Sequence, residues 1–365
     1  MSRFAVDLSS PRLRGDSAAH TDWLRTAVGP VLPCARPHGV LVLSAALVRE
    51  VLTDPARYSS AIMSTADTQL LGADGAAHRR VRRTLVRALR TADAAVARRR
   101  ARARAARLLG AFAAAGGGDA VAAVARPLAV FTAAEVLGLP VPAVRRLTAW
   151  AGAAVGAATS ARAGGDVGAL GGEATAAVRR ALGGAGRGLL GTLRAEVAAG
   201  TQTEDGALEV ALLVLLASLD TTTALVATCL SDLAVGREPA ADGAGPDAAA
   251  DARVGRVLAR RPPVRFVRRV ATAPHALGAH RVRAGEPVLV HLHSANAEEG
   301  GFAFGAGPHA CPGAPLARAV AAGALAAAAG LDLRPAGPPV PQDSAQIDGY
   351  AALPLHARRR EGSRR

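Results

Sequence analysis

The loop around Cys311 is the part of the sequence whose residue types best suggest chemistry. Residues 304–313 contain three glycines and lead into an Ala-rich segment with helical spacing. A thiolate is a strong, soft ligand for iron, and backbone N–H groups together with a helix start favour the thiolate over the thiol. Phe304 is expected to cover the sulfur, and His309 is placed to reach an anionic group. The alternative is a glycine-rich connection that holds a buried, inert cysteine.

A second candidate is the pair His78 and Arg82 in the basic string LLGADGAAHRRVRRTL. A spacing of four residues puts both side chains on one face of a helix, where together they can hold a single carboxylate. From these residues alone, an ordinary solvated basic helix explains the string at least as well.

A third candidate lies in the long apolar segment 204–233, where Asp220 is followed by Thr221. A charge inside an apolar helix is costly unless it is used or solvated. The Thr221 hydroxyl can bond the carbonyl of Ala217, four residues back, and open the helix locally to leave a groove for water. Asp220 and Thr221 would then be an acid and an alcohol that deliver protons. A capped or bent core helix is the alternative.

Composition limits the class of protein. The chain has 365 residues, of which 50% are hydrophobic and 20% charged, so it is expected to fold around a sizeable core. All 44 basic residues are Arg, which is typical of a high-GC bacterial genome and makes the net charge of +15 weak evidence for nucleic acid. The Arg runs 98–107 and 358–365 lack interleaved aromatics, so we expect solvated faces and, over 358–365, a disordered tail. We expect no nucleic-acid partner.

Location is predicted from the cysteines and the apolar runs. Three scattered cysteines cannot form a disulfide framework, and the first residues lack the pattern of a signal peptide. The longest apolar run contains Glu209, Asp220 and several hydroxyl groups, so a membrane span is not expected. These observations predict a cytoplasmic protein without a membrane partner.

The periodicities predict a mainly α, α+β fold, with many helices and a minor β part. Expected elements are a strand at 39–47, helices at 45–54, 78–109 (or two helices broken near 91–93), 128–140, 204–233, 254–260 and 314–329, a loop at 239–251 that can include a short helix, and short strands within 264–293 and in the tail before its charged end.

The ten-residue cysteine loop resembles the haem-binding loop of the cytochrome P450 family, Phe-x-x-Gly-x-His-x-Cys-x-Gly, and matches it at every fixed position. The resemblance implies a haem b cofactor with Cys311 as its iron ligand. It also implies that His78 and Arg82 hold one propionate, that Arg269 in the string PPVRFVRRV holds the other, and that His309 joins them. The loop residues carried over with these are Phe304, Gly305 and Gly313.

The resemblance extends over most of the chain. It implies a single P450-like domain over residues 1–365, a triangular prism of helices with a small β-rich part, and haem buried between the long central helix and the Cys loop. The string Ala217–Thr222 resembles the oxygen-activation helix of the family, which makes Asp220 and Thr221 the expected catalytic residues. Ser218 replaces the usual glycine there.

Two departures from the family are large. Alignment on Pro262 and Pro263 puts Arg256 and Ala259 where the family has Glu-x-x-Arg. The meander that normally precedes the haem loop is missing, since only residues 297–301 separate Asn296 from Phe302. Breaking one member of a buried charged network costs roughly 3–5 kcal/mol, whereas removing the whole network can be nearly neutral. We therefore interpret both losses as one coordinated simplification.

Together these patterns predict a haem-thiolate monooxygenase that uses O2 to oxidise a small, mostly apolar molecule, with secondary metabolism as the family-level expectation. Electrons are expected from another protein or from peroxide, because no flavin or nicotinamide fingerprint is present. The resemblance implies a ferredoxin and its reductase. The expected pocket segments 61–71, 152–200 and 265–272 carry no signature of a particular substrate. The alternative is an atypical P450-like haem protein that acts as a scaffold or a redox-neutral cyclase.

Overall fold

The computed structural model describes residues 5–10, 13, 17–61, 72–90, 92–148, 167–184, 187–236 and 245–360. Most of the expected pocket segment 61–71 and part of 152–200 lie outside them. Internal contacts divide the chain into two compact units, each assembled from three separate stretches. Unit 1 comprises Met1–Arg83, Ala259–Cys311 and Ser344–Asp348, and unit 2 comprises Thr84–Leu258, Pro312–Asp343 and Gly349–Arg365. The single domain over residues 1–365 stays a prediction.

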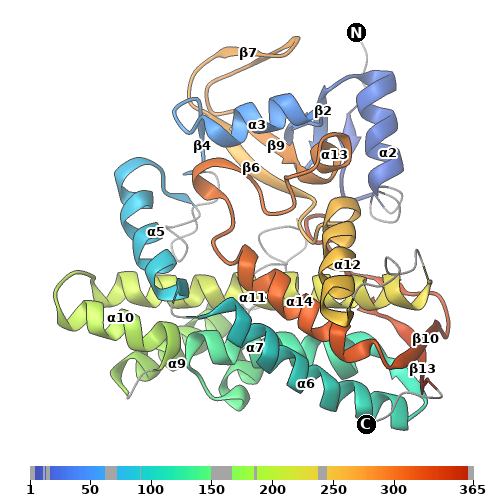
Figure 1. Ribbon diagram of the computed structural model, residues 1–365. Helices are drawn as coiled ribbons and strands as arrows, with labels where there is room; N and C mark the ends of the chain where they lie inside the picture. The colour runs from blue at the N-terminus through green and yellow to red at the C-terminus, as the bar shows by residue number, and fades with distance from the viewer. Residues whose placement is uncertain are drawn as a thin grey trace. The chain divides into compact units, whose positions relative to one another are not determined.

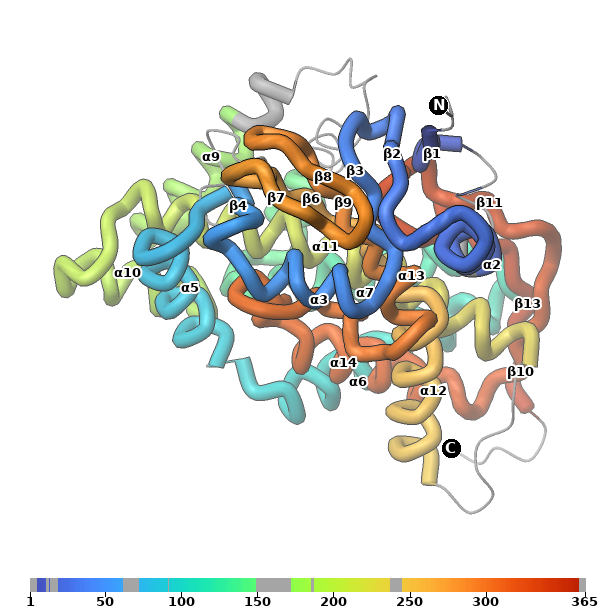
Figure 2. Tube along the Cα trace, turned by 90° about the horizontal axis from the view of Figure 1, so that it is seen from above, coloured from blue at the N-terminus to red at the C-terminus, as the bar shows by residue number. Residues whose placement is uncertain are grey.

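Unit 1 is built on a six-stranded mixed sheet (Figure 1). Figure 2 shows β2, β3 and β9 side by side. The strand pairs β1–β2 and β3–β9 are parallel and the other pairs are antiparallel. In sheet order the strands are β1 (Val6–Asp7), β2 (Val31–Arg36), β3 (Gly39–Val42), β9 (Pro287–His291), β6 (Phe266–Ala271) and β4 (Tyr58–Ser59).

Both faces of this sheet are buried, which explains the continuous apolar runs of its central strands. Val40 and Val42 of β3 pack into one cluster, whereas the alternate residue Leu41 packs into another. Helix α3 covers the first of these clusters. The remaining elements of unit 1 are α2 (Ser17–Trp23), the π-helical segment Leu24–Val28, α3 (Ala45–Thr53), the hairpin strands β7 (His275–Leu277) and β8 (His280–Val282), α13 (Leu292–Glu298) and the 3-10 turn Gly307–His309.

Unit 2 is mainly helical. Helix α5 (Gly75–Arg90) runs from unit 1 into it. Its helices are α6 (Ala94–Ala114), the π-helical segment Val121–Ala125, α7 (Arg126–Leu137), α9 (Val167–Gly183), α10 (Gly188–Ala198), α11 (Glu204–Ala234), α12 (Pro246–Arg260) and α14 (Ala314–Ala328). Its strands are β5 (Gly117–Asp119), β10 (Leu331–Pro335), β11 (Val340–Pro341), β12 (Tyr350–Ala352) and β13 (Pro354–Arg359).

Helix α11 forms much of the core of unit 2. It begins where the Thr203 hydroxyl accepts from the N–H of Gly206 at 3.1 Å, and Glu204 and Asp205 favour its N-terminus. Among the described residues it is the one helix that by itself is long and apolar enough to cross a membrane, yet 72% of its most apolar window is buried inside the protein. That burial is typical of a core helix.

The helical predictions are largely confirmed, and the fold class is α+β as expected. The basic segment forms two helices, because the Asp93 side chain accepts from the N–H groups of Ala95 and Val96 and caps α6. Helix α12 begins at Pro246, inside the expected loop 239–251. Strands β6, β7, β8 and β9 all lie within 264–293, where short strands are expected.

The expected disordered tail 358–365 is wrong at its start. Arg358 and Arg359 lie in β13 and pair with Asp332 and Leu331 of β10. The Arg360 Nε donates to the Leu331 carbonyl at 3.1 Å. Sheet pairing therefore orders residues whose composition alone favours solvation, and 361–365 lie outside the described residues.

The close packing of α14 on α6 generates a stability prediction. A Cβ at Gly323 of α14 would lie 2.7 Å from the Arg98 carbonyl oxygen, which is main chain and cannot rotate away. We expect Gly323→Ala to lower the free energy of unfolding by about 1–3 kcal/mol. Gly110→Ala on α6 is the control, because its Cβ meets nothing within 4 Å, and it should be neutral or slightly stabilising. Urea unfolding of both variants measures the difference, and equal midpoints would contradict the predicted overlap.

Candidate functional site

Hydrogen bonds between main-chain groups of the cysteine loop fix the path of the chain up to Cys311. The Cys311 N–H donates to the Phe304 carbonyl at 2.9 Å, and the Ala310 N–H donates to the Gly307 carbonyl at 3.1 Å. Gly305 and Gly307 have φ of +70° and +68°. A Cβ at Gly307 would also collide with the Leu52 carbonyl, so that position requires glycine.

Cys311 differs from the other two cysteines in exposure. Its side chain is exposed, whereas Cys34 and Cys229 are buried. Burial raises the pKa of Cys34 to about 11 and raises that of Cys229 further, so both stay protonated thiols. The interpretation of Cys311 as a buried, inert cysteine is therefore wrong.

His309 of the loop and His78 of α5 lie next to each other. The rings of His78 and His309 are 4.0 Å apart between centroids, and His78 is buried. Burial, and then the charge of Arg269, lower the pKa of His309 to about 4. Burial and the charge of Arg82 lower the pKa of His78 as well. Both rings are therefore neutral at pH 7, and the neighbouring Asp74 carboxylate only partly opposes the shift at His309.

Arg82, which is half-buried, and Arg269, which is buried, add positive charge next to the two histidines. The Arg82 Nη2 donates to the Ala310 carbonyl at 2.7 Å, one residue before Cys311. Arg269, which is only 6% exposed, donates from Nη1 to the Arg268 carbonyl at 2.7 Å. Burial lowers the pKa of both guanidinium groups. In the part of the chain that the structure describes, neither forms an ion pair with a carboxylate, so an anionic ligand would offset the cost of burying them.

Asp74 is a residue of this site that the sequence did not single out. Its carboxylate accepts from the Ser59 hydroxyl at 2.5 Å, the Ser60 N–H at 2.9 Å and the His309 Nε2 at 3.3 Å. Burial opposes the charge, but these hydrogen bonds lower the pKa of Asp74 below its usual value. Asp74 thus fixes the orientation of His309. The only sequence signal was its position four residues before His78.

The expected catalytic residues lie on α11 in unit 2. The Thr221 hydroxyl donates to the Ala217 carbonyl at 2.6 Å, as predicted. Burial raises the pKa of Asp220, although the charge of Arg126 opposes the shift. The helix is nearly all buried on both sides of 216–221, whereas Ala217 is exposed and Asp220 and Thr221 are partly exposed. The backbone stays helical through this segment, so the groove for water remains a prediction.

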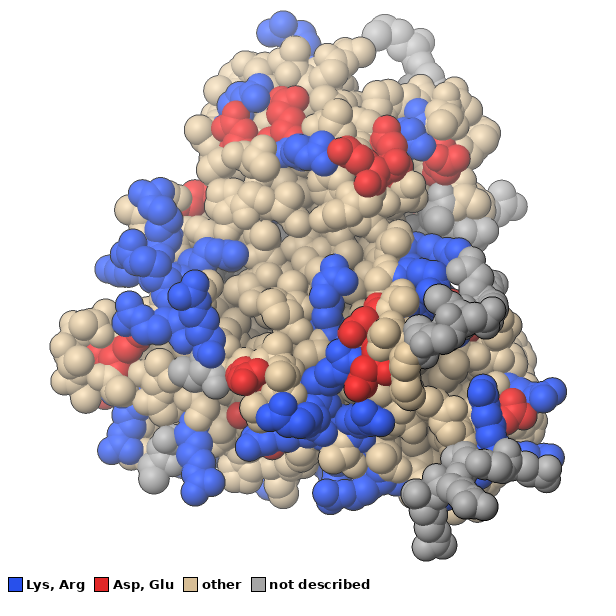
Figure 3. All heavy atoms as spheres, in the orientation of Figure 1, with Lys and Arg blue, Asp and Glu red and all other residues tan. Residues whose placement is uncertain are grey.

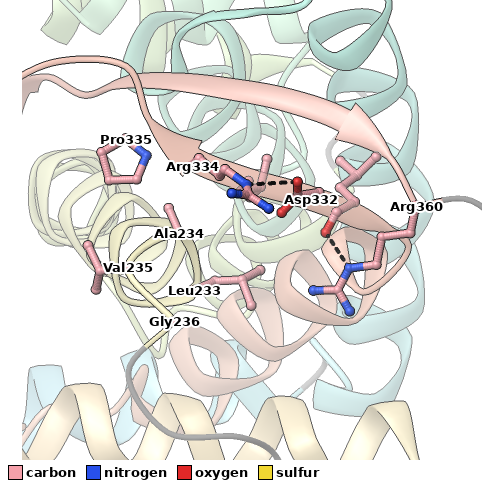
Figure 4. A pocket seen from close by; sticks show the side chains of 10 residues that line it. Leu233, Ala234, Val235, Gly236, Asp332, Arg334, Pro335 and Arg360 are labelled. Carbon is pink, nitrogen blue, oxygen red and sulfur yellow. Dashed lines mark hydrogen bonds and ion pairs between the residues drawn. The ribbon is translucent and has the colours of Figure 1, made fainter.

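A hollow in unit 2 can be compared with this site. It lies in unit 2 at the end of α11 beside β10 and has a volume of about 550 Å³ (Figure 4). Arg334 pairs there with Asp332 at 2.9 Å, and Arg360 donates to a main-chain carbonyl. Its charged groups are satisfied by neighbours, and it contains none of the expected site residues.

No family model and no curated protein matches the chain. Solved structures, however, match it over nearly its whole length. CalO2 superposes with a TM-score of 0.84 at 22% identity, covering 96% of this chain and 98% of that one. Cytochrome P450 CYP109Q5 from Chondromyces apiculatus gives 0.82 at 24% identity, with 98% and 99% covered. Cytochrome P450 TbtJ1 gives 0.82 at 26% identity, with 95% and 100% covered.

These likenesses agree with the residues already assembled. The fold matches over nearly the whole chain. The chain has the cytochrome P450 fold.

Proposed function

We propose that the protein is a haem-thiolate monooxygenase that uses O2 to oxidise a small, mostly apolar molecule in secondary metabolism. The observation that carries this proposal is the exposed Cys311 together with two guanidinium groups, the half-buried Arg82 and the buried Arg269, that form no ion pair with a carboxylate among the described residues. A single thiolate and an anion-binding site fit iron protoporphyrin, which carries its own nitrogen ligands and two carboxylates. The likeness to P450s crystallised with natural products, EryK with erythromycin B and MycG with mycinamicin V, supports the substrate class.

The residues of unit 1 would hold haem b by charge and by the thiolate. Cys311 would bind the iron, His78 and Arg82 one propionate, and Arg269 and His309 the other. Phe304 and Gly313 belong to the same loop, and Gly305 has open space where a Cβ would be. When bound, the haem iron supplies oxygen binding and activation. Propionates next to His78 and His309 would raise the pKa of both rings. The protonated rings would then bind the propionates more strongly.

Asp220 and Thr221 would supply protons. Burial keeps the Asp220 carboxyl protonated to a higher pH than an exposed carboxyl. The Thr221 hydroxyl donates its own hydrogen to Ala217, so its oxygen would accept a hydrogen bond from the group that carries the proton and hold that group in place. The Ser218 hydroxyl donates to the Leu215 carbonyl at 3.4 Å, so its hydrogen is already used in a bond within the helix.

The electron donor is proposed to be an acidic ferredoxin with its reductase. Arg side chains gather over α5 (Figure 3), where Arg79, Arg80 and Arg83 are exposed on the helix that also carries His78 and Arg82. Such a patch attracts an acidic partner at low salt. A cytoplasmic location is part of the proposal and fits the mostly buried α11.

A second candidate is a haem protein of this fold that does not oxygenate, a scaffold for a partner enzyme or a redox-neutral cyclase. The observation that favours it is the replacement of Glu-x-x-Arg by Arg256 and Ala259 together with the missing meander. The acid–alcohol pair on α11 favours the monooxygenase instead.

Cys311→Ala tests the iron ligand. The reduced, carbon-monoxide-treated wild type should show a Soret band at the thiolate position, and the variant should lose it because no other exposed thiol is described. Cys34→Ala, at a buried thiol of the same unit, should leave the band unchanged. A thiolate band that persists in the Cys311 variant would refute the assignment, and an imidazole-type band in the wild type would refute the monooxygenase.

Thr221→Ala tests proton delivery. Less product per electron and more peroxide should be released, while haem content stays unchanged, because only the alcohol of the pair is lost. Thr223→Ala is the matched control, since that hydroxyl makes the same type of bond to the Leu219 carbonyl at 2.7 Å but is buried. If both variants couple electrons to product as the wild type does, Thr221 has no such role.

Arg269→Gln tests the propionate site. Loss of a buried charge from an ion pair with a haem carboxylate should speed haem release to a haem-scavenging protein by at least about tenfold. Arg268→Gln is the control, because Arg268 adjoins it on β6 but points to the other face of the strand. Equal release rates in the two variants would exclude Arg269 from haem binding.

A further inference from the structure

Two of the buried polar side chains of helix α13 make hydrogen bonds that the proposed function does not use. His293 and Asn296 lie three residues apart, one turn of the helix, and are 2% and 4% exposed. Polar groups buried to this degree in native proteins are hydrogen-bonded, so their partners show what they hold in place.

Both side chains reach the corner that follows α12. The Asn296 Nδ2 donates to the Ala259 carbonyl at 2.6 Å. The His293 Nε2 lies 2.5 Å from the Pro262 carbonyl, so that nitrogen carries the hydrogen. The last carbonyls of a helix have no partners within it, and the following Pro262 and Pro263 have no N–H to offer. Helix α13 therefore caps the end of α12 with its side chains.

The other end of the Asn296 amide faces the cysteine loop. Its Oδ1 accepts from the N–H of Phe302 at 2.9 Å, and the Phe302 side chain is fully buried. The Phe302 carbonyl in turn accepts from Gly305 at 2.9 Å, and the Phe304 carbonyl accepts from Cys311 at 2.9 Å. One amide thus links the corner at Ala259 to the first turn of the loop that presents the sulfur.

Helix α13 is itself fixed on α3. The Glu298 carboxylate accepts from the Ala45 N–H at 2.7 Å. Both Nη atoms of Arg49 donate to Glu299, at 2.9 and 3.1 Å, and the Arg49 guanidinium lies 5.1 Å from the centre of the Phe302 ring. Asn296 is therefore attached to a helix that is held at its far end, as a positioning group requires.

We propose that Asn296 is a positioning residue for Cys311, with His293 as its support. The pair acts at the corner after α12, where the His293 Nδ1 also lies 3.9 Å from the buried Asp348 carboxylate that pairs with Arg265. The role at the iron rests on the proposed function, but the anchoring of the loop does not.

The test compares three variants of the full chain purified with haem. Asn296→Ala removes both hydrogen bonds. Asn296→Asp keeps an oxygen that accepts from Phe302 in either protonation state. Ser294→Ala is the control, because Ser294 lies on the same helix, is equally buried, and its hydroxyl has no hydrogen-bond partner among the described residues.

Two readouts are measured on each variant: amide hydrogen exchange of peptides covering 297–313, and the fraction of the carbon-monoxide complex with a thiolate-type Soret band. We expect Asn296→Ala to exchange about tenfold faster in this segment and to lose part of the thiolate band, and Ser294→Ala to match the wild type. Asn296→Asp should restore most of the protection.

The outcomes separate this proposal from the function. If Asn296→Ala exchanges like Ser294→Ala over 297–313, the anchoring role is overturned, whatever the spectrum of the wild type. If exchange rises throughout the chain and Asn296→Asp restores nothing, Asn296 only supports overall stability and the proposal is equally overturned. A wild type without a thiolate band refutes the proposed function, while the exchange data still decide whether Asn296 anchors the loop.

Discussion

Positive charge at buried and half-buried positions, with no carboxylate partner among the described residues, is the constraint on which the site depends. Arg82 and Arg269 come from a helix and a sheet strand of unit 1, and burial disfavours the charged form of each. A guanidinium does not lose its proton in proteins, so this cost can be offset only by hydrogen bonds to carbonyls or by an anion. The carbonyl of Ala310 accepts from Arg82. The same bond holds the residue before Cys311, so the anion site and the sulfur are coupled through one side chain.

The sequence predicted the parts of the site that are local in the chain. The cysteine loop is one continuous string, and His78 and Arg82 share a helix face through their spacing alone. It could not predict Asp74 or Asn296, whose roles depend on partners distant in sequence. Asp74 bonds His309 from 235 positions away, and Asn296 bonds Ala259 from 37. Such pairings are decided by how strands and helices assemble, and no periodicity records them.

The same distinction explains the fold. Helix α11 was predicted because its capping residues and its long apolar composition are intrinsic to the segment. Arg358 and Arg359 resemble a solvated tail in composition, yet pairing with β10 places them in a strand. Local propensity is a weak prior wherever a neighbouring edge offers unpaired N–H and C=O groups. The β7–β8 hairpin is a second example. Its two strands have only three residues each and pair with one another, so the pairing defines them rather than the propensity of either segment.

The corner that follows α12 combines a buried ion pair, Arg265 with Asp348, and a neutral amide, Asn296. A buried ion pair must recover the cost of desolvating two charges, and removing one member leaves the other unpaired. A neutral amide has a smaller desolvation cost and offers a donor and an acceptor at once. Asn296 uses both, toward Ala259 and Phe302. One neutral side chain thus joins the end of α12 to Phe302, shortly before the cysteine loop, without burying a further charge.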